Sequence, residues 1–142
     1  MLSDIESALV ELLKNALPDV HILTATDLSD IVEDSQPTPA VHVIYNGFRV
    51  IETRPDGKAA TIEQNWLTVV AIRNVRNRGS GASARQDAIA LTGSVAAALM
   101  GIKLQGSNRP LVIETPPRPG GQNGYSYTPL SWSVETNLQA KQ

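Results

Sequence analysis

The fold is decided by residues 40–75, AVHVIYNGFRVIETRPDGKAATIEQNWLTVVAIRNV, which place two apolar stretches on either side of a polar turn. The first stretch alternates with the period of two that is typical of a strand, and the second is rich in Val, Ile, Thr and Trp. Residues 54–57, Arg-Pro-Asp-Gly, supply turn chemistry. We therefore expect strands at 40–52 and 61–75 that pair as a long antiparallel hairpin, with a bulge at Gly47.

Two other segments have the period of a helix. Residues 4–16 collect Leu, Ile and Ala side chains on one face, after a capping box formed by Ser3 and Glu6. Residues 83–100 also collect apolar side chains on one face, and Gly101 suits the left-handed position at the helix end. Both helices should pack one face on a sheet.

Shorter patterns complete the order of elements. Residues 20–24 are consistent with an edge strand, 110–115 with a short strand and 125–138 with a long alternating strand, whereas 116–124 is rich in Pro and Gly and predicts a loop. We therefore expect one α/β (α+β) domain over residues 1–142. It should contain a mostly antiparallel sheet of about four to five strands, two helices packed on one face and a long hairpin.

Composition limits the possible functions. The 142 residues carry a formal charge of −2 without a basic block, so sequence-specific nucleic-acid binding is not expected. Cysteine is absent, which excludes disulfides and thiolate metal sites. The sequence predicts neither a signal peptide nor a membrane span. Only 18% of the residues are charged, and interface cores are depleted in charge in this way.

No residue pattern predicts catalysis, a cofactor or a metal site. His21 and His42 lack the spacing of metal ligands, and the acidic residues of 27–34 do not match a calcium loop. Gly79, Gly81 and Ala84 do fit the Gly-x-Gly-x-x-Ala pattern of a dinucleotide-binding loop. However, the preceding strand belongs to a hairpin, and no acidic residue follows at the required distance, so we expect a flexible loop.

One helix face stands out as a surface for protein contact. The solvent side of residues 83–100 is small and uncharged, which allows another backbone to approach closely. We expect Gln86, Ala90, Ser94 and Ala97 to form a subunit interface.

The sequence resembles a known family in its order of elements and in the residue pattern of several segments. These are PAVHVIYNGFRV (39–50), NWLTVVAIRNVRN (65–77), GSGASARQDAIALTGSVAAAL (79–99) and RPLVIETPPRPGGQNGYSYTPLSWSVET (109–136). Together they are similar to the Mu-like phage tail-terminator family, which is related in fold to the lambda minor tail protein called U.

This resemblance implies a structural protein and not an enzyme. Its members would form a homo-oligomeric, hexameric ring at the head-proximal end of the virion tail, assembled in the host cytoplasm. The ring would cap the tail tube protein, stop its polymerisation and meet the head-tail connector, and it could also meet the tape-measure protein. Basic loop residues would contact tube or connector: Arg54, Lys58, Arg76, Arg78 and Arg118.

Three alternatives remain open from the sequence. Another neck or tail-completion subunit would share the ring and the lack of chemistry. A small nucleotide-binding enzyme would use the loop at Gly79 and Gly81. A monomeric adaptor domain would stay at 15 kDa at every concentration.

Overall fold

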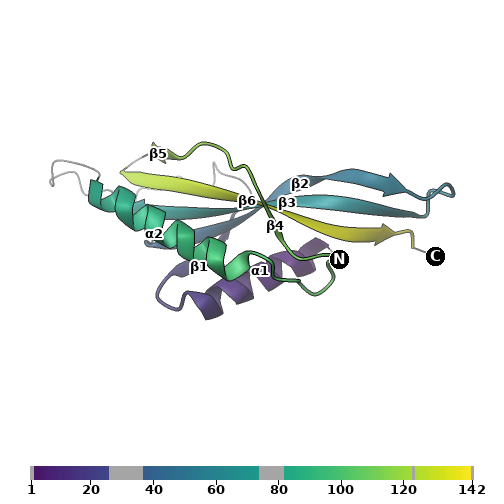
Figure 1. Cartoon of the computed structure of the whole chain (residues 1–142), viewed down its shortest axis with the longest axis horizontal. Helices are drawn as coiled ribbons and strands as arrows, with labels where there is room; N and C mark the ends of the chain where they lie inside the picture. Colours follow the sequence, from purple (N-terminus) through teal and green to yellow (C-terminus); the bar gives the residue numbers. More distant parts are fainter. Residues whose placement is uncertain (1, 26–36, 74–81, 123, 142) are drawn as a thin grey trace.

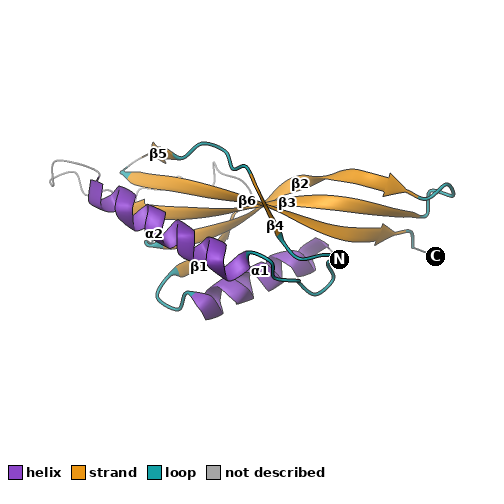
Figure 2. Cartoon of the chain, viewed as in Figure 1, coloured by secondary structure: helices purple, strands orange, loops and turns teal. Residues whose placement is uncertain are grey.

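A computed structural model describes residues 2–25, 37–73, 82–122 and 124–141. Within these residues, helices and strands form one sheet with a helical layer on one side (Figure 1, Figure 2). The elements in chain order are α1 (Leu2–Ala16), β1 (His21–Ala25), β2 (Ala40–Thr53), β3 (Ala59–Arg73), α2 (Ala82–Leu99), β4 (Val112–Glu114), β5 (Gly120–Gln122) and β6 (Tyr125–Gln139). Each predicted helix and strand is therefore found, with bounds shifted by a few residues.

The strands are hydrogen-bonded in the order β1-β2-β3-β6-β4, and β5 pairs with β6. Among the described strands, β1 and β2 run parallel and every other pair is antiparallel. The predicted α+β class is confirmed. The sheet has six strands, one more than the upper end of the expected four to five, because β5 forms inside the segment predicted to be a loop. Its three residues carry no alternating pattern, and their strand conformation comes from pairing with the start of β6.

The long hairpin is confirmed from Ala40, which pairs with Ala71, to Thr53, which pairs with Ala60. Gly57 has a φ of 73° and donates its N–H to the carbonyl of Arg54 over 2.9 Å, which closes the turn. The predicted bulge is also present, because the register shifts after Tyr45 and Gly47 has a φ of 87°. Only glycine adopts such a φ without strain, so Gly47 allows the bulge.

Both helices lie on one face of the sheet, as predicted (Figure 1). α1 buries the apolar face that its sequence defines, and α2 buries Ala88, Val95 and Leu99. The strands contribute alternate residues to the same core, so that a single apolar layer separates helices from sheet. Its fully buried members include Ile5, Leu9, Leu13, Val41, Val43, Val70, Trp132 and Val134.

The opposite face of the sheet has a second, smaller apolar cluster. Ile44, Leu67 and Val69 are buried there, with Ala25 and Tyr127 packed against them. β3 is therefore buried on both faces near its C-terminal end, which explains why its sequence is almost continuously apolar in that part.

Buried polar side chains are paired inside the helix-facing core. Gln64 is fully buried, accepts a hydrogen bond from Nε1 of Trp66 over 2.7 Å and donates its amide to Thr136 over 2.9 Å. Nε1 of Trp132 donates to Oγ1 of Thr68 over 2.9 Å. Because the Gln64–Thr136 and Trp132–Thr68 bonds link β3 with β6, they fix the register of the two longest strands.

Several predictions fall outside the described residues. These are the acidic stretch 27–34 and the loop that contains Gly79 and Gly81. The same holds for the side chain of Ser3, which was predicted to cap the first helix.

Candidate functional site

The sheet continues past the helices as a three-stranded arm made of residues 45–53, 59–65 and 134–139. Figure 1 shows it extending away from both helices, with the hairpin turn at its tip. β2 changes from buried to exposed at Tyr45, where the helical cover ends. The β2 part of the arm, residues 45–53, therefore presents strand surface that the rest of this chain does not cover, whereas Ile62, Gln64 and Val134 stay buried on the helix-facing side.

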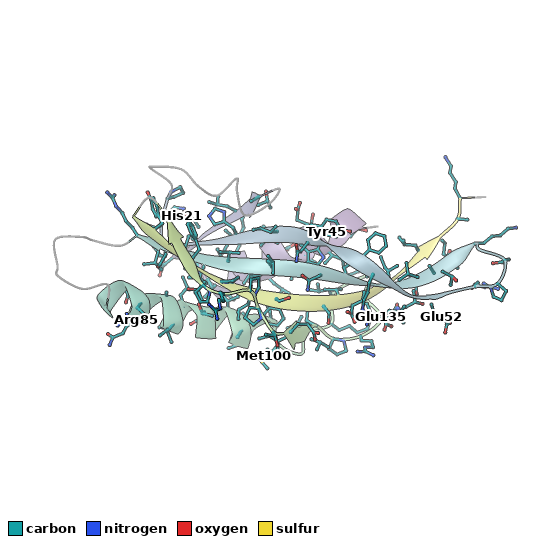
Figure 3. The ribbon with its side chains drawn as sticks, turned by 90° about the horizontal axis from the view of Figure 1, so that it is seen from above. His21, Tyr45, Glu52, Arg85, Met100 and Glu135 are labelled. Atoms are coloured by element: carbon teal, nitrogen blue, oxygen red, sulfur yellow. The ribbon has the colours of Figure 1, made fainter. Side chains whose placement is uncertain are left out.

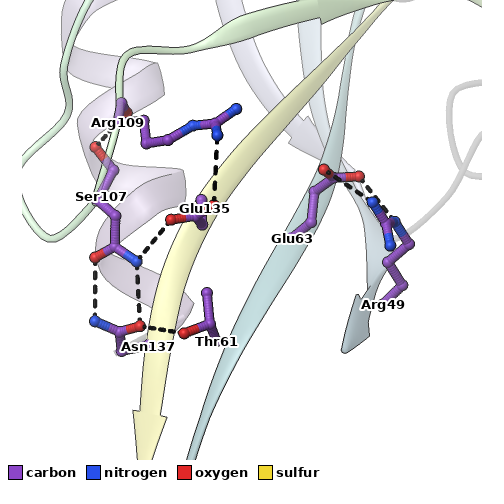
Figure 4. Close-up of polar contacts among 8 residues, drawn as sticks. Arg49, Thr61, Glu63, Ser107, Arg109, Glu135 and Asn137 are labelled. Atoms are coloured by element: carbon purple, nitrogen blue, oxygen red, sulfur yellow. Dashed lines mark hydrogen bonds and ion pairs between the residues drawn. The ribbon is translucent and has the colours of Figure 1, made fainter. Parts of the chain in front are cut away.

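The face of the arm that points away from the helices is polar. Arg49 and Glu63 form an exposed ion pair of 3.1 Å, a contact worth at most about 1 kcal/mol on a surface. Asn46 and Asn65 are joined across β2 and β3 by a 2.8 Å hydrogen bond. Further contacts on this face, drawn in Figure 4, join Thr61 to Asn137 over 3.1 Å and Arg109 to Glu135 over 3.8 Å. These charged side chains are therefore paired with one another, and the amides and the threonine are joined by hydrogen bonds.

The tip of the arm collects cations around a hollow of about 490 Å³. Arg54 and Lys58 line it together with Lys141, and Asp56 is the one carboxylate in the lining. Two of the predicted contact residues, Arg54 and Lys58, are thus brought together by the hairpin turn. The other lining residues are Ala59, Gln139 and Ala140.

Arg118 does not belong to this cluster. It precedes β5, which pairs with Tyr125–Tyr127 at the start of β6, whereas Gln139 at the end of β6 lines the hollow at the tip. The length of that strand puts the two regions roughly 45 Å apart. Arg76 and Arg78 lie outside the described residues.

The predicted helix face is exposed on α2. Gln86, Ala90, Ser94 and Ala97 are all accessible, and Ser94 donates its hydroxyl to the carbonyl of Ala90 over 3.2 Å. Since that bond satisfies the hydroxyl locally, the face offers little polarity of its own. Ala90 and Ser94 also border a hollow of about 410 Å³ whose other side is formed by Val20, Thr38, Pro39, Ile72 and Arg73.

Sequence reasoning missed the large apolar side chains that remain accessible. Ile89 on α2 is 64% exposed, and Phe48 and Val50 on the arm are 46% and 52% exposed. Met100, just after α2, is 54% exposed. The alternation of residues 40–52 predicts that one face of this strand is apolar. Where along the strand that face becomes exposed depends on where the helices end.

The part of the chain that is described contains no group of three or more His, Asp or Glu side chains placed to hold a metal ion. His21 is exposed on β1, whereas His42 is buried on β2, and desolvation lowers the pKa of His42 below 6.5. This burial disfavours the charged imidazolium form. No described helix is long and apolar enough to cross a membrane.

The described part of the chain is an α+β domain whose prominent surfaces are an open strand edge on β2 and a helix face of mostly small side chains on α2. The family model of the phage tail terminator protein matches residues 2–142, and the chain therefore belongs to the phage tail terminator family. This is a family of structural proteins of the virion and not of enzymes.

A solved structure has the same fold. It is a chain of the "Virion of native gene transfer agent (GTA) particle", with a TM-score of 0.57 and 14% sequence identity. The alignment covers 96% of this chain and 97% of that chain. A search of curated protein sequences finds no significant match.

Proposed function

We propose that this chain is a tail terminator in the strict sense: a ring of identical subunits that caps the tail tube, stops its polymerisation and presents a surface to the head-tail connector. The observation that carries the proposal is the family match, which spans residues 2–142. The whole chain then acts as one domain whose function is contact and not catalysis.

The exposed surfaces support ring formation. A closed ring requires two different surfaces on each copy, because each subunit meets one neighbour on either side. The face of Gln86, Ala90, Ser94 and Ala97 is one proposed contact, since small side chains let a neighbouring backbone approach closely. Six copies are the proposed number, and the virion tail, at its head-proximal end, is the proposed location after assembly in the host cytoplasm.

The cationic arm tip supports a contact outside the ring. Arg54, Lys58 and Lys141 surround the hollow at the tip, and cations at such a projecting position suit a carboxylate-bearing protein surface. We propose that this tip, together with Arg76, Arg78 and Arg118, contacts the tail tube protein or the connector. The tape-measure protein is a further possible neighbour at the tube end.

Mass measurement with negative-stain microscopy tests the ring, and tail length tests its role. The purified chain should give closed rings at several times its 15.2 kDa mass, either alone or on tail tubes. Phage lacking the chain should make tubes of uncontrolled length, and supplying the wild-type chain should restore one length. Tails of normal length without the chain would overturn the proposal. A variant with Gln139 replaced by alanine provides a control for expression and purification.

A further inference from the structure

The two flanks of the sheet both carry exposed apolar side chains but differ in charge, which limits how two copies of the chain can meet. The β2 flank consists of α1, the turn after it and the free part of β2, residues 45–53. The β4 flank consists of residues 100–119, which run from the end of α2 through β4. Figure 3 shows Tyr45 on one side of the sheet and Met100 on the other, in line with the strand order, where β2 and β4 lie on opposite sides of β3 and β6.

The β2 flank has an open strand edge with apolar side chains. β1 covers β2 only from Ala40 to Ile44, so residues 45–53 have no strand on their outer edge among the described residues. Tyr45, Phe48 and Val50 pair with Trp66, Gln64 and Ile62, all on the helix-facing side of the sheet. Each of these three β2 side chains is exposed, and together they form an apolar row beside an unpaired edge.

The β4 flank has a comparable apolar surface. Met100, Ile102, Val112 and Ile113 are all exposed. Two backbone hydrogen bonds, from Leu111 to Ile102 over 2.9 Å and from Gly101 to Leu111 over 3.4 Å, hold the segments on either side of the connecting loop together. The four side chains are therefore carried by a fixed part of the fold. Val112 and Ile113 point to opposite faces of the edge strand β4, so both faces of this edge carry an exposed apolar side chain, and such side chains suit protein contact.

The charges of the two flanks are opposite. On the β2 flank, α1 and the turn after it carry four carboxylates, Asp4, Glu6, Glu11 and Asp19, against the single cation Lys14. Arg49 and Glu52 cancel on the free part of β2. The β4 flank carries three cations, Lys103, Arg109 and Arg118. Its carboxylates are Glu114 and the neighbouring, half-buried Glu135.

This distribution decides which surfaces can meet. Two β2 flanks brought face to face would oppose acidic surfaces, whereas the β4 flank has an excess of only one cation, so its cations gain more from an acidic β2 flank than from a second β4 flank. A β2 flank against a β4 flank would instead bury apolar side chains on both sides and pair opposite charges at the rim. We infer that the occupant of each flank is a second copy of this chain, with the β2 flank of one copy docked on the β4 flank of the next. Such a head-to-tail contact closes into a ring by rotation.

This inference rests on the proposed ring and assigns its subunit interface. The chain has no cysteine, so single introduced cysteines report on contacts without background. Phe48→Cys and Ile113→Cys change exposed side chains on the two flanks, and Asp56→Cys at the arm tip is the control. Circular dichroism of each variant verifies the fold before mixing.

Equal amounts of two variants are mixed under the conditions in which the wild type assembles, either at the same protein concentration or on tail tubes. Oxidised glutathione is then added to form disulfides. We expect the Phe48→Cys chain to cross-link to the Ile113→Cys chain at least tenfold more than either variant cross-links to itself or to the control. A chain that carries both cysteines should give a ladder of oligomers that ends at a closed ring. Equal yields for all pairs, or a dominant self-pair, would overturn the inference.

Charge reversal separates this interface from the proposed function. Lys103→Glu should block the ring, and Glu11→Lys supplied on the same chain should restore it at least in part. Rings that form normally from Lys103→Glu and from Phe48→Glu would overturn the flank interface while leaving the ring itself intact. A wild type that stays at 15.2 kDa with and without tail tubes would overturn both.

Discussion

Replacing Gln64 with methionine should lower the free energy of unfolding by about 3 kcal/mol. Methionine keeps the unbranched shape of glutamine but can neither accept the hydrogen bond from Trp66 nor donate one to Thr136. Trp66 is 2% exposed, so its indole N–H would be stranded away from water, which costs about 2 kcal/mol. The lost bond to Thr136 adds about 1 kcal/mol, because Oγ1 of Thr136 loses the amide N–H from which it accepts a hydrogen bond.

Urea unfolding at one fixed protein concentration measures the difference, since association would otherwise contribute to the apparent stability. Gln139→Met makes the same chemical change at an exposed position near the end of β6 and should stay within about 0.5 kcal/mol of the wild type. Trp66→Phe in the Gln64→Met background tests the cause, because it removes the stranded N–H. The pair should then cost less than the sum of the single changes. A loss below about 1 kcal/mol for Gln64→Met would refute the reasoning.

Four further outcomes follow from the same structure. Leu9→Ala, at a fully buried position between α1 and the sheet, should cost about 2–5 kcal/mol in urea unfolding, and a loss under 1 kcal/mol would contradict the described core. Burial lowers the pKa of His42 below 6.5, so the free energy of unfolding should be highest above about pH 6.5 and should fall as the pH drops below it. His42→Gln should flatten this part of a plot of unfolding free energy against pH, and an unchanged slope would argue against this role of His42. Ala90→Arg should prevent ring closure while the chain stays folded, with Ala90→Ser as the matched control, and sedimentation as an intact ring would remove that face from the interface. Reversing Arg54 and Lys58 to glutamate should leave the ring intact but disturb tail length or head joining, whereas unaltered virions would exclude the arm tip as a contact.

The proposed contacts differ in how far the sequence could predict them. The uncharged face of α2 was predictable, because a helical period assigns Ala90 and Ser94 to the side opposite Leu99. The flank contact was not, because Phe48 and Ile113 look like ordinary strand residues in the sequence. Their exposure depends on where the helices end and on which strands lie at the sheet edges.

The sequence by itself determined the local elements. Alternation over residues 40–52, the Val, Ile and Thr content of residues 61–75 and a Pro-Asp-Gly turn between them predicted the hairpin. A helical period predicted α1 and α2, and the glycines at 47 and 101 marked the bulge and a helix end. These features depend on neighbours along the chain, whose steric and hydrogen-bonding preferences act over a few residues.

Only the tertiary structure decided which strands lie side by side and which surfaces stay open. The parallel pairing of β1 with β2 and the burial of Gln64 beside Thr136 depend on residues far away in the sequence, whereas β5 pairs with β6 only a few residues further along the chain. The arm is exposed because the helices are shorter than the strands that they cover. Burial is a property of the whole packed chain, so no local pattern could assign the two apolar flanks to opposite sides of the sheet.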